Sequence, residues 1–172
     1  RDPFLNDIDS ARRDYLALRE HANSAQLATL DSDRAPESSY APCVTYEGSY
    51  YLFLSRLASH TDNLMRNPEI GLMLLEDEAG AANPFARKRI NLQGRAEPVA
   101  RDSAQFRIVL DLFHHRFGKV MEIIEPLPDF QLFCVHPETG RFVRGFGQAY
   151  QLEGDRLDRL THVDPGQSSE DV

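Results

Sequence analysis

The 172-residue sequence contains no tryptophan, only two cysteines, and no apolar run long enough to cross a bilayer. Cys43 and Cys134 lie in separate apolar stretches, and neither belongs to a CxxC pair, so no zinc motif is present. We expect two buried free thiols, which are typical of a reducing compartment. The first residues, RDPFLNDIDSARRDYL, lack the apolar segment of a signal peptide. These features predict a cytoplasmic protein without a membrane partner.

Positive charge is also scarce. The chain has 19 lysines and arginines against 27 aspartates and glutamates, a net charge of −8. Proteins that bind nucleic-acid phosphates usually carry a basic surface, so we do not expect a nucleic-acid partner. The sequence also lacks a GxSxG nucleophile motif and internal repeats. With 41% hydrophobic and 27% charged residues, it is typical of a globular protein.

The order of apolar and polar residues predicts one domain over residues 1–154, which begins with a helix within residues 1–23. A further helix is expected from Asp102 to Gly118, and residues 155–172 are expected to form a polar tail. The strands cluster as hairpins without regular βαβ alternation, which favours an antiparallel sheet or barrel. The expected strands are Ala25–Asp31, Ser39–Glu47, Ser49–Ser55, Glu69–Asp77, Arg87–Val99, and two strands within 130–152 around a turn at Glu138–Gly140.

The segment LSRLASHTDNLMRNP, residues 54–68, joins an expected strand to an expected helix. A helix that begins near His60 would present free backbone N–H groups and the positive end of its dipole. Ser59 and Thr61 are candidate helix caps, and Arg56 lies just upstream. The segment is therefore either an anion site or an ordinary capped helix with a solvated arginine.

A second candidate is the basic segment ARKRINLQGRAEPV. In a regular strand, Arg87 and Arg89 share one face, and Lys88 lies on the other. Two guanidinium groups on one face suit a phosphate or a pair of carboxylates. The alternative is a solvated strand end.

A third candidate is FVRGFGQAY, in which Gly145 and Gly147 alternate with Phe146. Glycines two positions apart in a strand leave one face bare, so a flat ligand or another backbone can approach closely. The alternative is a β-bulge or close sheet packing.

Five segments occur in an order that resembles one known family: LATLDSDRAPESSYAPCV, SRLASHTDNLMRNPEIGLML, ARKRINLQGRAE, RFGKVMEIIEPLPDFQLF and FVRGFGQAYQLEGD. Together they resemble the haem-utilisation HugZ/HutZ family. This family is a branch of the flavin-binding split-barrel superfamily that includes pyridoxamine 5′-phosphate oxidase. The resemblance extends from Leu27 to His162.

The resemblance implies a mainly β fold with flanking helices: a six-stranded antiparallel split β-barrel that forms a homodimer, with cofactor clefts at the dimer interface. In flavin-binding relatives the matching segments hold the FMN phosphate. In the haem-utilising branch the cleft holds haem, and an acid matching Asp129 influences the axial histidine across the interface. The implied phosphate contacts are Ser55, Arg56, Thr61, Arg87 and Lys88, and the implied haem neighbours are His60 and Arg89.

The iron ligand of this branch is a histidine in the C-terminal tail. Ungapped matching places Gln167 at that position, and glutamine is a poor haem ligand. His162 lies five residues earlier and is the alternative ligand for the haem iron. The sequence departs from the family pattern at this position.

Three functions follow from the resemblance. The first is a haem-binding or haem-degrading protein of iron acquisition, which breaks haem down with oxygen and electrons from an external donor or reductase. The second is an FMN-dependent oxidoreductase or FMN-binding protein of the pyridoxamine 5′-phosphate oxidase type. The third is a storage or scaffold dimer without turnover. The sequence therefore leaves open whether the protein is an enzyme.

Overall fold

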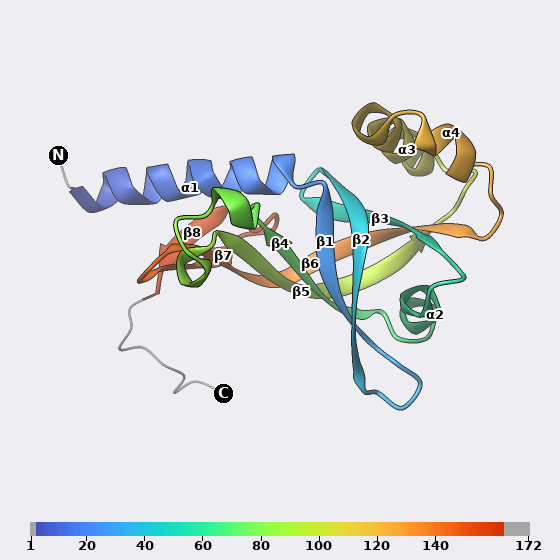
Figure 1. Ribbon diagram of the computed structural model, residues 1–172, viewed down its shortest axis with the longest axis horizontal. Coiled ribbons are helices and arrows are strands. Elements are labelled where there is room, and N and C mark those ends of the chain that lie inside the picture. Colours follow the sequence, from blue (N-terminus) through green and yellow to red (C-terminus); the bar gives the residue numbers. More distant parts are fainter. Residues whose placement is uncertain (1–2, 164–172) are drawn as a thin grey trace.

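The computed structural model describes residues 3–163, in which a β-barrel carries helices at its ends (Figure 1). The helices are α1 (Pro3–His21), α2 (Ser59–Arg66), α3 (Ala104–Phe117) and α4 (Val120–Ile124), with short 3-10 turns η1 (Glu78–Gly80) and η2 (Pro84–Ala86). The strands are β1 (Ser24–Leu30), β2 (Pro36–Tyr46), β3 (Ser49–Ser55), β4 (Glu69–Leu75), β5 (Arg89–Val99), β6 (Phe130–Gly145), β7 (Gln148–Glu153) and β8 (Arg159–His162).

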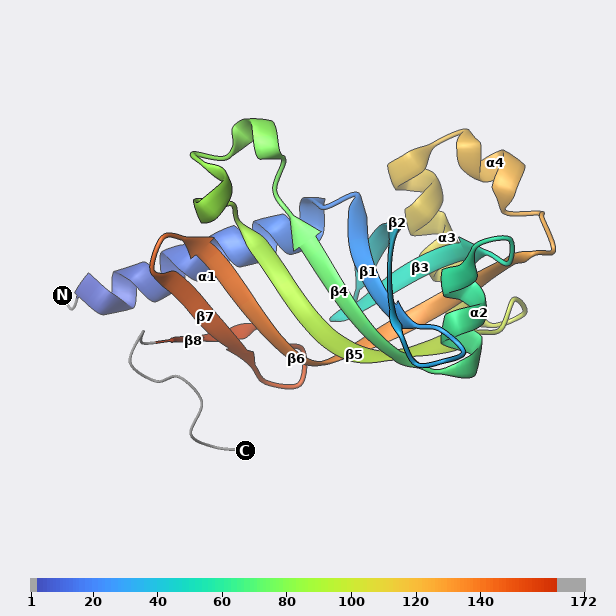
Figure 2. The ribbon, with the colours of Figure 1, turned by 60° about the horizontal axis from the view of Figure 1, so that its bottom comes forward.

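Six of the strands close into an antiparallel ring. The sheet runs β3-β2-β1-β4-β5-β6, and an additional β3–β6 pairing joins its two ends. This topology confirms the expected mainly β class and the six-stranded split barrel. Strand β6 extends beyond the ring and carries β7 and β8, which lie beside α1 (Figure 2).

The predicted turn at Glu138–Gly140 is wrong, because β6 passes through it. Gln93 of β5 pairs with Thr139 and Gly94 pairs with Pro137, so residue 138 is left over as a β-bulge. The long strand β5 pairs with both halves of β6. The proline and glycine of this segment therefore bend one strand instead of ending it.

Of the two alternatives for FVRGFGQAY, the glycine face open to a ligand is wrong, and the β-bulge is confirmed by the shift in the β6–β7 register between Val143 and Gly145. Gly145 and Gly147 flank the hairpin turn between β6 and β7, where Gly145 pairs with Gln148. Gly147 adopts a φ of +67°, which favours glycine. The two glycines therefore serve a turn, and the intervening Phe146 is 78% exposed.

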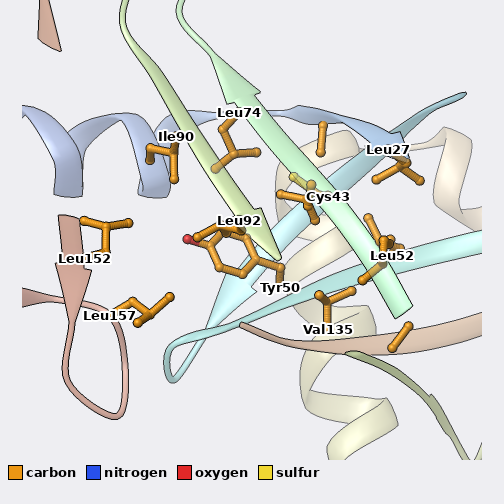
Figure 3. Packing of buried hydrophobic residues seen from close by; sticks show 14 of the residues in the cluster. Leu27, Cys43, Tyr50, Leu52, Leu74, Ile90, Leu92, Val135, Leu152 and Leu157 are labelled. Atoms are coloured by element: carbon orange, nitrogen blue, oxygen red, sulfur yellow. The ribbon is translucent and has the colours of Figure 1, made fainter. Parts of the chain in front are cut away.

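Two hydrophobic cores hold the fold together. The barrel core gathers buried side chains from all eight strands, from α1 and α2, and from the segment before β8; Figure 3 shows part of it. The second core packs α3 on the outside of the barrel, where the Phe53 ring lies 5.1–6.3 Å from those of Phe106, Phe113 and Phe130. Both cysteines are free and buried, as predicted, and burial raises the pKa of Cys43 to about 12.

The first part of the predicted polar tail belongs to the sheet. Strand β8 pairs with β7, and Leu157 and Leu160 are buried in the barrel core. The Tyr15 hydroxyl of α1 donates to the Leu157 carbonyl oxygen at 2.5 Å, which ties this segment to the first helix. Residues 164–172 lie outside the described part of the chain. Within the described part, none of the helices combines the length and apolar character needed to span a membrane.

Arg144 fastens α1 to the sheet, and its replacement by alanine is the first prediction. Its guanidinium donates to Asp14 at 2.8 Å, Asp7 at 3.0 Å and Ser10 at 2.6 Å, while its side chain is only 19% exposed. We expect Arg144→Ala to lower the free energy of unfolding by about 1–3 kcal/mol, because charge-assisted hydrogen bonds are lost from a half-buried site. Urea denaturation measures this loss.

The matched control is Arg159→Ala. Arg159 also pairs with a carboxylate, that of Glu153 at 3.4 Å, but its side chain is 72% exposed. Such surface pairs contribute less than about 1 kcal/mol. Equal losses in the two variants would contradict a special role for Arg144.

Candidate ligand-binding site

Ser55 organises the turn from β3 into α2. Its hydroxyl donates to the Asp129 carboxylate at 2.8 Å and accepts from the Leu57 N–H at 3.1 Å. The Thr61 hydroxyl donates to the Ser55 carbonyl oxygen at 2.5 Å. The Arg56 N–H also donates to the Asp129 carbonyl oxygen, at 2.8 Å. The hydroxyls of Ser55 and Thr61, both predicted to contact an anion, are thus engaged within the chain.

The expected side-chain cap of α2 is wrong. The residue before the helix is Ala58, which makes no side-chain cap, and the Ser59 hydroxyl donates to Glu37 instead. Arg56 is exposed, and its guanidinium forms no ion pair with any carboxylate of residues 3–163. Of the groups predicted to bind an anion at this end of the barrel, Arg56 is the one available to a ligand.

His60 is buried against the barrel. The residue is 8% exposed, and its Nδ1 atom lies 2.9 Å from the Ser39 hydroxyl. Ser39 pairs with Leu27, a core residue, so this hydroxyl lies on the inward face of β2. Burial lowers the pKa of His60, and the nearby Glu37 carboxylate opposes this change. The ring is therefore neutral near pH 7.

The pKa of His60 predicts a pH dependence of stability. The unfolded state takes up a proton near the ordinary value of 6.5, whereas the folded state resists protonation until lower pH. The unfolding free energy that His60 contributes is therefore unaffected above about pH 6.5, the ordinary histidine pKa, and it falls as the pH drops below that value. His60→Gln should flatten the decline in unfolding free energy between about pH 7 and pH 5. The control His115→Gln, at an exposed position of α3, should leave the decline unchanged.

The second basic segment differs from its prediction at Arg87. Strand β5 begins at Arg89, so Arg87 precedes the strand and does not share its face. Its Nε donates to the Glu76 carbonyl oxygen at 2.8 Å, and its Nη1 lies 3.5 Å from the Glu78 carboxylate. Arg87 is therefore paired within the chain.

Lys88 and Arg89 differ in their partners. The Lys88 ammonium lies 3.4 Å from the Asp14 carboxylate on α1. Arg89 donates to the Arg87 carbonyl oxygen at 3.0 Å and makes no ion pair with a carboxylate of residues 3–163. Arg89 is thus the cation of this segment whose charge is not neutralised by a carboxylate of residues 3–163, and it is available to bind an anionic ligand.

A groove of about 730 Å³ lies on the outward face of the barrel, and the sequence did not reveal it. Small residues such as Ala28 and Gly71 keep the groove open between longer polar side chains. The only sequence signal was the alternation of exposed polar residues along β5, which marks an outward face without showing that it is hollow. One row of register partners crosses the groove: Gln26, Met73, Asn91, Arg141 and Gln151.

The two candidate segments lie at opposite ends of the barrel. Ser55 pairs with Phe130 at the start of β6, whereas Arg89 pairs with Val143 near its end. These thirteen positions of extended strand span roughly 40 Å along β6. Both ribbon views place α2 and the start of β5 at opposite ends (Figures 1 and 2). One chain therefore does not bring Arg56 and Arg89 together.

His162 lies at the same end of the sheet as Arg89. It is exposed on β8, pairs with Tyr150, and its ring meets the Tyr150 ring edge-on at 5.4 Å. Strand pairing puts His162 in the same cross-strand row as Ile90, and Arg89 is the residue next to Ile90 on β5. Because neighbouring residues of a strand point to opposite faces, the side chains of His162 and Arg89 lie on opposite faces of the sheet. Over residues 3–163, no group of three His, Cys, Asp or Glu side chains is arranged to hold a metal ion. Gln167 lies outside the described residues.

Comparisons with known proteins decide the family. A family model described as pyridoxamine 5′-phosphate oxidase matches residues 12–144. The chain is 41% identical over 149 residues to heme oxygenase HutZ of Vibrio cholerae, covering 87% of this chain and 85% of that protein. The chain belongs to the HugZ/HutZ haem-utilisation family.

Solved structures of HugZ/HutZ-like proteins agree with this assignment. The crystal structure of HutZ, described as a heme storage protein, matches with a TM-score of 0.70 at 36% identity, over 73% of this chain and 89% of HutZ. Campylobacter jejuni ChuZ matches with a TM-score of 0.83 at 33% identity, over 91% of this chain. The match spans 63% of the ChuZ chain. HutZ is thus described once as an oxygenase and once as a storage protein.

Proposed function

We propose that this protein binds haem for iron acquisition, in a site that two copies of the chain build together. The observation that carries the proposal is the 41% identity to heme oxygenase HutZ over 87% of the chain. The similarity to the structures of HutZ and ChuZ supports it. The two free thiols fit a reducing cytoplasm as its location.

The shared site follows from the separation of Arg56 and Arg89. Each chain supplies one half at the α2 end and the other half at the start of β5. In a two-fold dimer, a contact from the α2 end of one copy to the β5 end of the other is repeated in the opposite direction. The α2 end of each copy would therefore lie beside the β5 end of the other. Two equal sites would result. A homodimer is therefore part of the proposal.

The groups at these two ends fit the chemistry of haem. Haem is a flat apolar ring with two carboxylates, and the groove offers small, partly apolar walls near Arg89. Unpaired guanidinium groups suit carboxylates because they donate in a planar fork. Asp129, held by Ser55, would orient a neighbouring imidazole by accepting its N–H. His162 is the iron ligand that the resemblance offers among the described residues, but its side chain lies on the sheet face opposite to Arg89, so one chain does not bring it to the groove.

Bound haem iron would supply the oxygen chemistry, with electrons from an external donor or reductase. The chain's own contribution would be to bind the carboxylates, orient the ring and hold the axial imidazole. Haem breakdown is thus the enzymatic form of the proposal, and haem storage without turnover is its non-enzymatic form. Loss of the haem absorbance with ascorbate in air, but not under nitrogen, would distinguish breakdown from storage.

FMN is the alternative cofactor, and the pyridoxamine 5′-phosphate oxidase family model favours it. Of the five residues expected to contact the FMN phosphate, four already bind partners within the chain. Ser55 and Thr61 use their hydroxyls in the turn before α2, and Arg87 and Lys88 pair with carboxylates. Arg56 is the one of these five expected contacts that is still available to a phosphate, which favours haem over FMN.

Titration of the purified apo-protein with haemin tests the proposal. We expect a Soret band that saturates at about one haem per chain, since two-fold symmetry gives two sites per dimer. A parallel titration with FMN should leave flavin fluorescence unquenched. If no Soret band appears and the FMN fluorescence is quenched, the haem proposal is refuted and the flavin alternative is supported.

A further inference from the structure

A second arginine lies beside Arg89 on the outward face of the barrel. Arg89 and Asn91 are two positions apart on β5, and Asn91 pairs directly with Arg141 on β6. Direct partners and residues two positions apart share a face, so both arginine side chains lie on the groove side. They form a diagonal cross-strand pair, with Cα atoms roughly 7–8 Å apart.

Both guanidinium groups lack a counter-ion within the described part of the chain. Arg141 is exposed, and its Nε lies 3.3 Å from the Gln151 amide oxygen, which is uncharged. Arg89 donates to a backbone carbonyl oxygen. Neither makes an ion pair with any carboxylate of residues 3–163, although the chain carries 27 aspartates and glutamates. Two uncompensated cations on one face of an acidic protein indicate a place for an anion.

The same face offers room for the rest of a ligand. Asn91 and Arg141 line the groove of about 730 Å³, and Ala28, Gly71 and Met73 form part of its walls. Arg89 follows in the next row of the same face. A ligand that fits here has an anionic end at the arginines and a flat, partly apolar body along the groove.

We propose that Arg89 and Arg141 form a paired cationic subsite that binds the carboxylates of the ligand. The inference rests on the proposed function, under which these carboxylates belong to haem. Arg141 is absent from the segments whose resemblance suggested haem contacts. Only the pairing register places it beside Arg89.

Haemin and its dimethyl ester separate this role from general effects, because the ester lacks the carboxylate charge. We expect Arg141→Ala to weaken haemin binding by about tenfold and to leave ester binding unchanged. Arg89→Ala should behave in the same way. The control Arg13→Ala removes an exposed arginine of α1 and should change neither affinity. Unchanged haemin affinity in Arg141→Ala, or equal weakening of haemin and ester, would overturn the subsite.

A second probe keeps the inference testable if the wild-type protein binds no haemin, a result that would refute the proposed function. Pyrophosphate is a compact anion that two guanidinium groups can share. It should raise the melting temperature of the wild-type protein and have a smaller effect on Arg141→Ala. No stabilisation of the wild-type protein by pyrophosphate, in the absence of haemin binding, would refute the subsite as well.

Discussion

Gly94→Ala should destabilise the protein by about 2–4 kcal/mol, because a β-carbon has no room at this position. A β-carbon built on Gly94 would lie 2.2 Å from the His136 carbonyl oxygen and 3.0 Å from the Pro137 Cα atom. Both are backbone atoms of the paired strand β6, at the β-bulge that keeps β6 continuous. The backbone would have to shift apart, and ladder hydrogen bonds of the barrel would weaken.

Gly80→Ala is the matched control. No atom lies within 4 Å of a β-carbon at Gly80, which ends the short turn η1. Alanine there should change stability by less than about 1 kcal/mol, through the entropy of the unfolded chain. Urea denaturation measures both variants. A loss below 1 kcal/mol at Gly94 would contradict the close packing of β5 against the bulge.

Arg56→Ala and Arg89→Ala should each weaken haem binding by about 1–3 kcal/mol, the loss expected for one charge-assisted contact. Each residue provides a guanidinium without a carboxylate partner in the described chain, and the two lie at opposite ends of the barrel. Haemin titration gives both affinities. Arg13→Ala again serves as the control for the loss of one surface charge.

The folding stability of these variants distinguishes binding from structure. Both arginines are at least partly exposed, and neither joins an ion pair with a carboxylate of residues 3–163, so unfolding free energies should stay within about 0.5 kcal/mol of the wild type. Wild-type haem affinity in both variants would remove these arginines from the site.

The barrel could be predicted because its strands carry local signals. Alternating burial along β5 and the tight turn at Gly48 follow from residues close together in sequence. Strand β8 was missed because Leu157 and Leu160 are isolated apolar residues whose partners lie on distant elements. Proline and glycine occur both in turns and in β-bulges, so the sequence predicts a turn at Glu138–Gly140. The bulge becomes evident only because β5 is long enough to pair with β6 on both sides of residue 138.

The candidate site was predicted less well, for a related reason. Sequence pointed to Arg87, Lys88 and Arg89 as one basic cluster, yet the fold gives the first two acidic partners from η1 and α1. Conversely, Arg141 is more than fifty residues from Arg89 in sequence and becomes its neighbour only through strand pairing. Charge can be counted along a sequence, but its neutralisation depends on which segments meet.

The central claim is that two copies of the chain share each haem site, and mixing two weakened variants tests it most directly. Arg56→Ala and Arg89→Ala proteins, combined under conditions that exchange subunits, form mixed dimers in which one site lacks both arginines and the other retains both. Statistical exchange makes about half of the dimers mixed, so about a quarter of all sites should recover wild-type haem affinity. If each site is built within a single chain, the mixture will bind haem no better than the separate variants, and the account is contradicted.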